Sequence, residues 1–241
     1  VYTAIFTPTI NGVCTIDVSL NSFVDTVGNS NTAVTRFNWT FDNKKPTLSL
    51  VDISSNNSSD TLAKEGDSIT LSFTASEAIT PIVTFSCGSA AISDTNITYA
   101  NSDGIVMKVW TAVYTTNTND TEGLVTYSIA FDDLAGNSGT AVTTGTGSVT
   151  FDKTNPTLSL VDMSSNNTDT TLSKTGDVIT LTFTADEEIK APVVTFSCGS
   201  AAINDTITYT PDITNKIWTA AYTTNISDTD GLVTYSIAFD D

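Results

Sequence analysis

The sequence predicts an all-β chain made of tandem two-sheet Greek-key β-sandwich domains of about 110 residues. Three observations support this prediction: a long internal repeat, short runs in which polar and apolar residues alternate, and the lack of any segment that keeps a helical period over three turns. Seven short runs fit within one repeat, which suits a two-sheet sandwich. A β-propeller is the alternative fold, but propeller blades recur at roughly half this period.

The repeat is visible as nearly identical text. TFDNKKPTLSLVDISSNN at Thr40 to Asn57 returns as TFDKTNPTLSLVDMSSNN at Thr150 to Asn167, and FSCGSAAI and GLVTYSIAFDD each occur twice. DTVGNSNTAVT near the start also echoes the later DLAGNSGTAVT. We therefore expect residues 1–40 to be the last three strands of a preceding repeat, 41–150 to be a complete repeat, and 151–241 to be a repeat that lacks its last strand.

The first half of the complete repeat gives the clearest strands. Thr47 to Asp52 follows Pro46, which cannot donate to a strand ladder and so suits a strand start. Ser68 to Ala75 alternates Ser and Thr with Ile, Leu, Phe and Ala, so its apolar face is expected in the core. Ile82 to Cys87 buries Val, Phe and Cys by the same parity, and a short strand is expected at Ile97 to Tyr99.

The second half is less uniform. Val106 to Thr115 carries apolar residues on both faces, so its orientation stays open from sequence alone. Leu124 to Phe131 alternates cleanly and is expected to bury Val, Tyr, Ile and Phe. Thr140 to Val149 is expected as the last strand, although its pattern is weak.

Several spaced motifs resemble a known family. They are a Pro that follows an Asp before the first strand, GDxIxLxFTAxE at Gly66 to Glu77 and Gly176 to Glu187, and an FDDLAGNSGT turn. This combination resembles the bacterial immunoglobulin-like tandem repeats of large surface adhesins and extracellular fibres. The resemblance implies tandem immunoglobulin-like Greek-key β-sandwich domains and an extracellular or cell-surface location.

The net charge and the apolar content of the chain exclude some classes of binding partner. The chain carries 27 acidic against 9 basic residues, a formal charge of -18, which repels nucleic acid and anionic membrane surfaces. No run of about eighteen apolar residues occurs, so we expect no membrane insertion in this segment. The lack of an initiator Met and of a signal peptide leads us to expect a window on a longer exported chain.

The residues of common active sites are missing. The sequence has no His, no P-loop, no CxxC and no GxGxxG between a strand and a helix. Two carboxylates would be enough to hydrolyse a glycoside, but a catalytic pair seldom needs copying along a polymer. We therefore predict no enzymatic activity and no catalytic residue.

Acidic residues gather in three loops that a sandwich of this topology brings to one end. The predicted calcium ligands of the complete repeat are Asp42, Glu77, Asp132, Asp133 and Asn137, and their equivalents in the next repeat are Asp152, Glu187, Asp240 and Asp241. A calcium ion that stiffens the linker is one hypothesis, and it fits what the resemblance implies. The other is a solvated acidic turn in which the aspartates cap backbone amides and bind no metal.

The cysteines are expected to stay unpaired. Cys87 and Cys198 occupy the same place in successive repeats, whereas Cys14 aligns with Val125. A disulfide between the two strands concerned needs both cysteines in one repeat, and neither repeat with Cys87 or Cys198 has both. We predict no disulfide within this chain and treat Cys87 and Cys198 as small buried apolar residues.

Eight Asn-x-Ser/Thr sequons occur, close to the number that chance gives in a chain so rich in Asn, Ser and Thr. They begin at Asn38, Asn56, Asn57, Asn96, Asn119, Asn166, Asn204 and Asn225. Asn56 and Asn166 lie at the same turn of successive repeats, so a glycan there would recur along a fibre in a host that glycosylates exported chains.

These features favour a structural extracellular protein: an array of repeats that forms a filament, stalk or sheath, with copies of itself or the same longer chain as partners. The last repeat would receive its final strand by covalent continuation or, alternatively, from a neighbouring chain. The other class of function is an adhesin module that binds carbohydrate or a surface protein. Exposed aromatic residues would favour that class, and Trp39, Trp110 and Trp218 are the candidates.

Overall fold

The structure is a computed structural model that describes residues 3–92 and 97–241. The chain divides into two compact units, Val1–Lys153 and Thr154–Asp241, which we describe separately. Apart from one 3-10 turn at Gly104–Val106, the regular elements of the described residues are β-strands. The predicted all-β class is confirmed.

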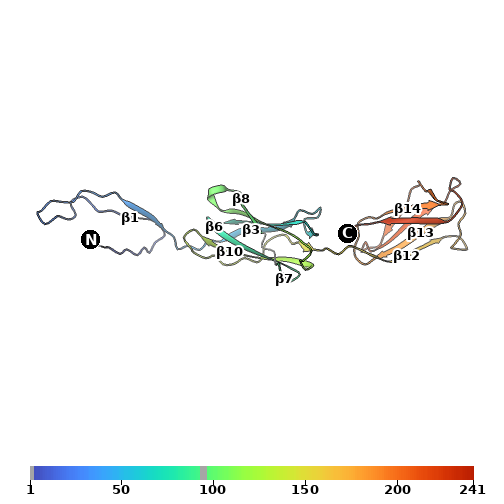
Figure 1. Ribbon diagram of the computed structural model, residues 1–241, viewed down its shortest axis with the longest axis horizontal. Helices are drawn as coiled ribbons and strands as arrows, with labels where there is room; N and C mark the ends of the chain where they lie inside the picture. Colours follow the sequence, from blue (N-terminus) through green and yellow to red (C-terminus); the bar gives the residue numbers. More distant parts are fainter. Residues whose placement is uncertain (1–2, 93–96) are drawn as a thin grey trace. The chain divides into compact units, whose positions relative to one another are not determined.

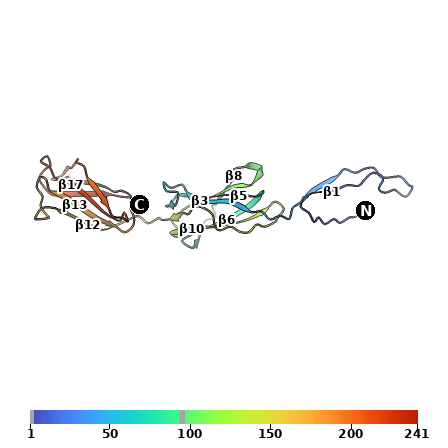
Figure 2. The ribbon, with the colours of Figure 1, turned by 180° about the vertical axis from the view of Figure 1, so that it is seen from behind.

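The first unit holds a sandwich of two sheets, with β3 and β8 in one layer and β6 and β10 in the other (Figures 1 and 2). One sheet has the order β3-β5-β9-β8, and the other has the order β4-β11-β10-β6-β7. The strands of the first sheet are β3 (Leu48–Ser55), β5 (Ser68–Ala75), β9 (Val109–Thr115) and β8 (Thr98–Asn101). Those of the second are β4 (Leu62–Ala63), β11 (Thr150–Phe151), β10 (Gly123–Asp133), β6 (Ile79–Cys87) and β7 (Ala90–Ala91).

This strand order is that of an immunoglobulin-like sandwich. The chain passes repeatedly from one sheet to the other, and strands that are far apart in sequence pair within each sheet. The two longest strands of the second sheet, β6 and β10, pair antiparallel from Val125 opposite Cys87 to Asp133 opposite Ile79. Their buried residues, among them Val83, Phe85, Val125 and Ile129, therefore fall on one face of the ladder. The second prediction, an immunoglobulin-like Greek-key sandwich, is confirmed as well.

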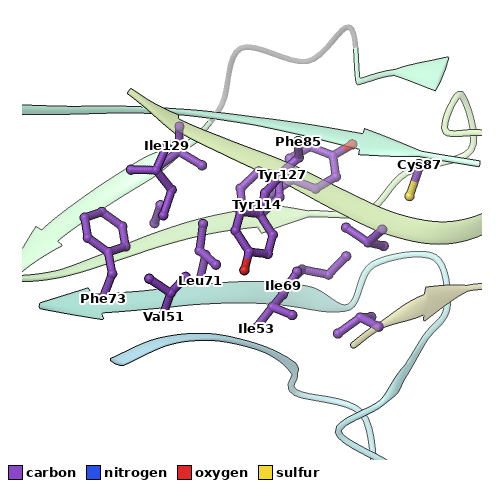
Figure 3. Packing of buried hydrophobic residues seen from close by; sticks show 14 of the residues in the cluster. Val51, Ile53, Ile69, Leu71, Phe73, Phe85, Cys87, Tyr114, Tyr127 and Ile129 are labelled. Carbon is purple, nitrogen blue, oxygen red and sulfur yellow. The ribbon is translucent and has the colours of Figure 1, made fainter. Parts of the chain in front are cut away.

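The core lies between the two sheets, as Figure 3 shows for Leu71 and Tyr114 on one side and Phe85 and Ile129 on the other. All four side chains are buried. Burying an aliphatic or aromatic side chain contributes about 1.5–3 kcal/mol, so this layer dominates the stability of the unit. In β9 the buried face is the one with Tyr114, while Val109 is exposed, which settles the orientation that the sequence left open.

The last predicted strand, Thr140 to Val149, differs from the expectation because it does not form one continuous strand. Val142 exchanges two backbone hydrogen bonds with Ile129 of β10, at 2.9 and 3.1 Å. Further along, Thr146 exchanges two with β3, since its N–H donates to Val51 at 2.8 Å and its carbonyl accepts from Ile53 at 3.1 Å. The segment therefore crosses from one sheet to the other, which no regular strand can do.

Glycine explains how this crossing is accommodated. A Cβ on Gly145 would lie 2.3 Å from the carbonyl oxygen of Val51 and 2.7 Å from the hydroxyl of Tyr127. Only a residue without a side chain can lie this close to the β3 backbone. The segment returns to the second sheet where the N–H of Val125 donates to Val149 at 2.8 Å, and β11 follows directly.

Residues 3–41 form a separate two-stranded ladder of β1 (Gly12–Ile16) and β2 (Phe37–Phe41). The strands pair antiparallel with Cys14 opposite Trp39. Most side chains of this segment are exposed, including Phe37 and Val13. In the complete repeat the residues equivalent to Cys14 and Trp39 are Val125 and Val149, both buried.

The second unit repeats the architecture with sheets ordered β12-β13-β17-β16 and β15-β14-β18. The strands are β12 (Leu158–Ser165), β13 (Val178–Ala185), β17 (Ile217–Thr223), β16 (Thr208–Pro211), β15 (Ala201–Ala202), β14 (Val193–Cys198) and β18 (Val233–Ala238). Its core is built around Leu181, Phe183 and Phe196, at positions equivalent to core positions of the first unit. The residue boundaries expected for the three repeats stay a prediction.

Candidate functional site

Three acidic side chains meet at one end of the first sandwich. Asp42 follows β2, Glu77 lies in the turn between β5 and β6, and Asp133 is the last residue of β10. One carboxylate oxygen from each of the three lies within 4.8 Å of the others. Asp42 and Glu77 are half-buried and Asp133 is buried.

Asp133 is held by the turn that follows it. Its Oδ1 accepts hydrogen bonds at 2.8 Å from the N–H groups of Ala135 and Asn137, and its Oδ2 accepts one at 2.8 Å from Nδ2 of Asn137. Burial raises the pKa of Asp133, but the bonds from Asn137, Ala135 and Gly136 more than offset burial, so the net pKa is lowered. The carboxylate is thus ionised at neutral pH.

Asn137 links this turn to the segment between β2 and β3. Its Nδ2 also donates to the carbonyl oxygen of Asp42 at 3.2 Å, while the side chain of Asp42 accepts from the N–H of Lys44 at 2.9 Å. The predicted residues Asp42, Glu77, Asp133 and Asn137 therefore lie together. Asp132 does not join them, because alternation along β10 turns it to the exposed face opposite Asp133.

The arrangement could hold a hard cation. Three carboxylates whose oxygens approach this closely repel one another in the absence of positive charge. The ammonium group of Lys108 lies nearby, where it donates to the carbonyl oxygen of Ser76 at 3.0 Å, beside Glu77. Carboxylate and carbonyl oxygens are the ligands that Ca²⁺ prefers, and its geometry is flexible.

The corresponding residues of the next repeat fall on both sides of the division between the units. Asp152 is half-buried in the first unit, while Glu187 is half-buried in the second unit. Asp240 and Asp241 are exposed, and their carbonyl oxygens accept hydrogen bonds from the N–H and the ammonium group of Lys190, respectively. The second set of predicted ligands stays a prediction.

Two linker contacts were missed by the sequence reasoning. The N–H of Asn43 donates to Oδ1 of Asn11 at 3.0 Å, and the N–H of the equivalent Lys153 donates to Oε1 of Glu122 at 3.1 Å. Nζ of Lys153 adds bonds to the carbonyl oxygens of Thr118 at 2.8 Å and Asp120 at 2.7 Å. The sequence does show a polar residue, Asn11 or Glu122, directly before a glycine in each case. Polar residues are so common in turns that this pattern did not predict the contacts.

A buried Tyr-Asp pair also recurs. The hydroxyl of Tyr114 donates to Oδ2 of Asp120 at 2.5 Å, and the N–H of Asn117 donates to the same oxygen at 2.8 Å. Tyr222 and Asp228 repeat the pair in the second unit, where burial and then the bond to Asp228 raise the pKa of Tyr222 well above its ordinary value. This network closes a loop and exposes no reactive atom.

The three cysteines are free thiols. Cys87 is buried directly opposite Val125, and burial, with a smaller contribution from the charge of Asp120, raises the pKa of its thiol to about 11. Burial also raises the pKa of Cys198, which is half-buried, and Cys14 is half-buried on β1.

The sequons fall into two structural groups. The amide nitrogens of Asn57 and Asn225 donate to Asp67 and Asp205, respectively, and both asparagines are half-buried. The exposed sequon residues are Asn38, Asn56, Asn119, Asn166 and Asn204. Asn96 lies outside the described residues.

The tryptophans differ in their surroundings. The indole N–H of Trp110 donates to the carbonyl of Met107 at 3.0 Å, and Trp218 repeats this bond with Asn215 at 2.9 Å. Both pack against the cores, so neither offers a free ring face. Trp39 lies on β2, with its ring 5.8 Å from that of Phe6 and 5.9 Å from that of Phe37.

Comparisons with known proteins return solved structures but no family and no curated relative. A scan against protein-family models and a search of curated proteins both find no match. Solved structures that resemble the chain include the I-band fragment I67-I69 of titin, at 12% identity and a TM-score of 0.40 over 81% of this chain and 65% of the fragment. The titin domains Z1Z2 in complex with telethonin match at 16% identity and a TM-score of 0.28, over 83% of this chain and 96% of theirs.

The tandem Ig repeats of Dlar also match, at 9% identity and a TM-score of 0.26 over 81% of this chain and 94% of theirs. The chain spans less than two thirds of the length of the titin I-band fragment named above. At such identities the likeness concerns the fold alone, and the strand pairing carries the assignment. Among the described residues, no helix has the length and apolar content needed to cross a bilayer.

Proposed function

We propose that this chain is part of a structural extracellular protein, a tandem array of immunoglobulin-like repeats that forms a filament, stalk or sheath. The observation that carries the proposal is the recurrence of the same side-chain bonds at equivalent positions of successive repeats. The Tyr-Asp pair, the Trp to main-chain bond and the linker bond each occur twice. Repeating the same bonds in each repeat suits an array of identical units that bear force, since none of these groups points to a ligand.

Lateral or end-to-end contact with other copies would complete the array, and the resemblance to surface fibres supports an extracellular location. Electron microscopy of the native material tests this proposal. We expect beaded or multistranded fibres with a repeat set by single sandwiches. A population of dispersed, compact particles would contradict an array.

We further propose that calcium stiffens the linker through Asp42, Glu77 and Asp133. The linker residue Asp42 is bonded to the β10 turn through Asn137, and the next residue, Asn43, is bonded to Asn11 of the preceding segment. A cation on the same side chains would join three loops by bonds stronger than these. It would also relieve the repulsion within the carboxylate group.

Thermal unfolding in calcium and in a chelator tests this site. Calcium that binds only the folded state raises the midpoint, by about 2.7 kcal/mol of stability when its concentration is a hundred times Kd. We expect Glu77→Gln to abolish most of this increase and Asp132→Asn, which changes the charge equally on the opposite face, to preserve it. An unchanged midpoint in calcium would leave only the acidic turn, and equal loss in both variants would indicate nonspecific screening.

The second candidate function is an adhesive module for carbohydrate or a surface protein. It is favoured by the aromatic group of Phe6, Phe37 and Trp39, because Phe6 and Phe37 are 57% and 67% exposed. Against it, Trp39 occupies the position of the buried core residue Val149. A glycan array probed with the chain and with Trp39→Ala would show Trp39-dependent binding if this function held.

A further inference from the structure

One position before a strand differs in its chemistry among the three repeats. It is the residue that precedes the glycine at the start of β1, at the start of β10 and just ahead of β18, namely Asn11, Glu122 and Asp230. All three residues are exposed. Two repeats thus place a carboxylate at this position, whereas the first segment places the amide that corresponds to aspartate.

The glycine that follows is fixed by packing and by backbone conformation. In the complete repeat, a Cβ on Gly123 would lie 2.9 Å from Cα of Gly88. In the second unit, a Cβ on Gly231 would lie 2.7 Å from Cα of Gly199. Gly12 has a φ of 134°, which residues with a side chain rarely adopt. The repeat therefore keeps a glycine here, and in the first segment this creates the one Asn-Gly pair of the sequence.

The surroundings of Asn11 favour an attack on its side-chain amide. Its Oδ1 accepts a hydrogen bond at 3.0 Å from the N–H of Asn43, so the negative charge that develops on this oxygen during an attack on Cγ is stabilised. The main-chain nitrogen of Gly12 is the next one along the chain, and its bonding to Cγ closes a succinimide ring.

Gly12 also leaves room for this ring. It belongs to the terminal pair of the β1 and β2 ladder, opposite Phe41, and such ends open at little cost in free energy. Among the described residues other than its chain neighbours, none has a heavy atom within 4 Å of the place that a Cβ on Gly12 would take. Neither the ladder nor a neighbouring side chain therefore blocks the approach of the two groups.

We propose that Asn11 is a site of spontaneous deamidation. The nitrogen of Gly12 loses its proton and bonds to Cγ of Asn11, the bond from Cγ to Nδ2 breaks, and Nδ2 leaves as ammonia. Water then opens the succinimide at either of its carbonyl groups and gives aspartate or isoaspartate. One water is consumed and one ammonia is released, with no change of oxidation state.

The product reproduces a contact that the next repeat has by sequence. There, Oε1 of Glu122 accepts from the N–H of Lys153 at 3.1 Å, which corresponds to the bond between Asn11 and Asn43. Aspartate at position 11 replaces a neutral acceptor with a charged one, and hydrogen bonds to charged acceptors are stronger. Isoaspartate instead lengthens the main chain by one methylene before β1. Both products change the linker contact, and the reaction depends on neither calcium nor an array.

Peptide mapping by mass spectrometry tests the site in the intact chain 1–241. The folded protein is incubated at mildly alkaline pH in water enriched in heavy oxygen and is then digested in ordinary water, so only conversion in the folded protein carries the label. We expect Asn11 to acquire label, in both products, before the exposed residues Asn38 and Asn204 do. The control Asn11→Gln keeps a side-chain amide but must close a larger ring, so its peptide should stay unlabelled.

Amide exchange measures the effect on the linker. In Asn11→Asp, the N–H of Asn43 should exchange with solvent about fivefold more slowly than in the parent or in Asn11→Gln, because its acceptor is charged. The proposal is overturned if Asn11 acquires label no faster than Asn38 and Asn204, or if label enters only when heavy-oxygen water is present during digestion. Equal exchange at Asn43 in all three proteins would refute the strengthened linker bond.

Discussion

The complete sandwich and the second unit share the order of their first sheet, yet they bury the strand equivalent to β10 to different extents. Residues 138–151 hydrogen-bond β10 at Phe131, Ile129 and Val125, while Tyr235 of β18 is exposed and Ile237 is half-buried. The equivalent strands β5 and β13 show no such difference, since Leu71 and Leu181 are both fully buried. One irregular segment therefore decides how much of the second sheet becomes core.

The largest expected effect tests this coverage. Ile129→Ala should destabilise the first unit by about 2–5 kcal/mol, because it leaves a cavity in a fully packed core. Ile237→Ala should cost the second unit about 1 kcal/mol, since its site is partly open to water. Denaturant unfolding of the unit that carries each change measures the two values, and equal losses would contradict the comparison.

The Tyr-Asp pairs give the next effect. Tyr114→Phe removes a donor from the buried carboxylate of Asp120 and should cost about 1–3 kcal/mol. Tyr222→Phe should cost less, because Asp228 is half-buried and water can replace the hydroxyl. A greater loss from Tyr222→Phe in thermal unfolding would reverse the interpretation.

The turns at Asp133 and Asp25 sharpen the comparison through pH. Hydrogen bonds lower the pKa of both carboxyls, with Asn29 as the main donor to Asp25. Their contribution is therefore complete above the unfolded pKa of about 3.9 and is lost as the pH falls through the lower, folded pKa. Asp133→Asn should cost about 1 kcal/mol at pH 7, and the difference from the parent should vanish below that folded pKa.

Asp25→Asn should have a smaller effect at every pH, because Asp25 is exposed although it makes the same turn. Thermal midpoints measured from pH 7 to pH 2 check both variants. A difference between Asp133→Asn and the parent that grows as the pH falls would show that the carboxylate is destabilising.

The smallest effect concerns reactivity rather than stability. Cys87 is buried with its pKa raised to about 11, whereas the equivalent Cys198 is half-buried. Iodoacetamide at neutral pH should therefore modify Cys198 faster than Cys87 in the native protein, by mass spectrometry of peptides. Equal rates that match those of the denatured chain would mean that neither thiol is protected.

Much of the fold could be predicted because alternation is a local property. The range Ser68–Ala75 agrees with the predicted strand, and the strand around Leu124 to Phe131 extends only to Gly123 and Asp133. The segment Thr140 to Val149 could not be predicted as it is, since Thr146 bonds to β3, a strand about ninety residues away, and Gly145 allows this close approach. At the acidic site, the meeting of three loops followed from topology, but the outward direction of Asp132 depended on where β10 ends.

The sequence by itself determined the repeat, the all-β class and the faces of the regular strands, because repetition and period-two alternation are written in neighbouring residues. Only the tertiary structure decided which carboxylates meet and which tryptophans are covered. These features depend on contacts between residues far apart in the chain, and no local pattern records the distance between them.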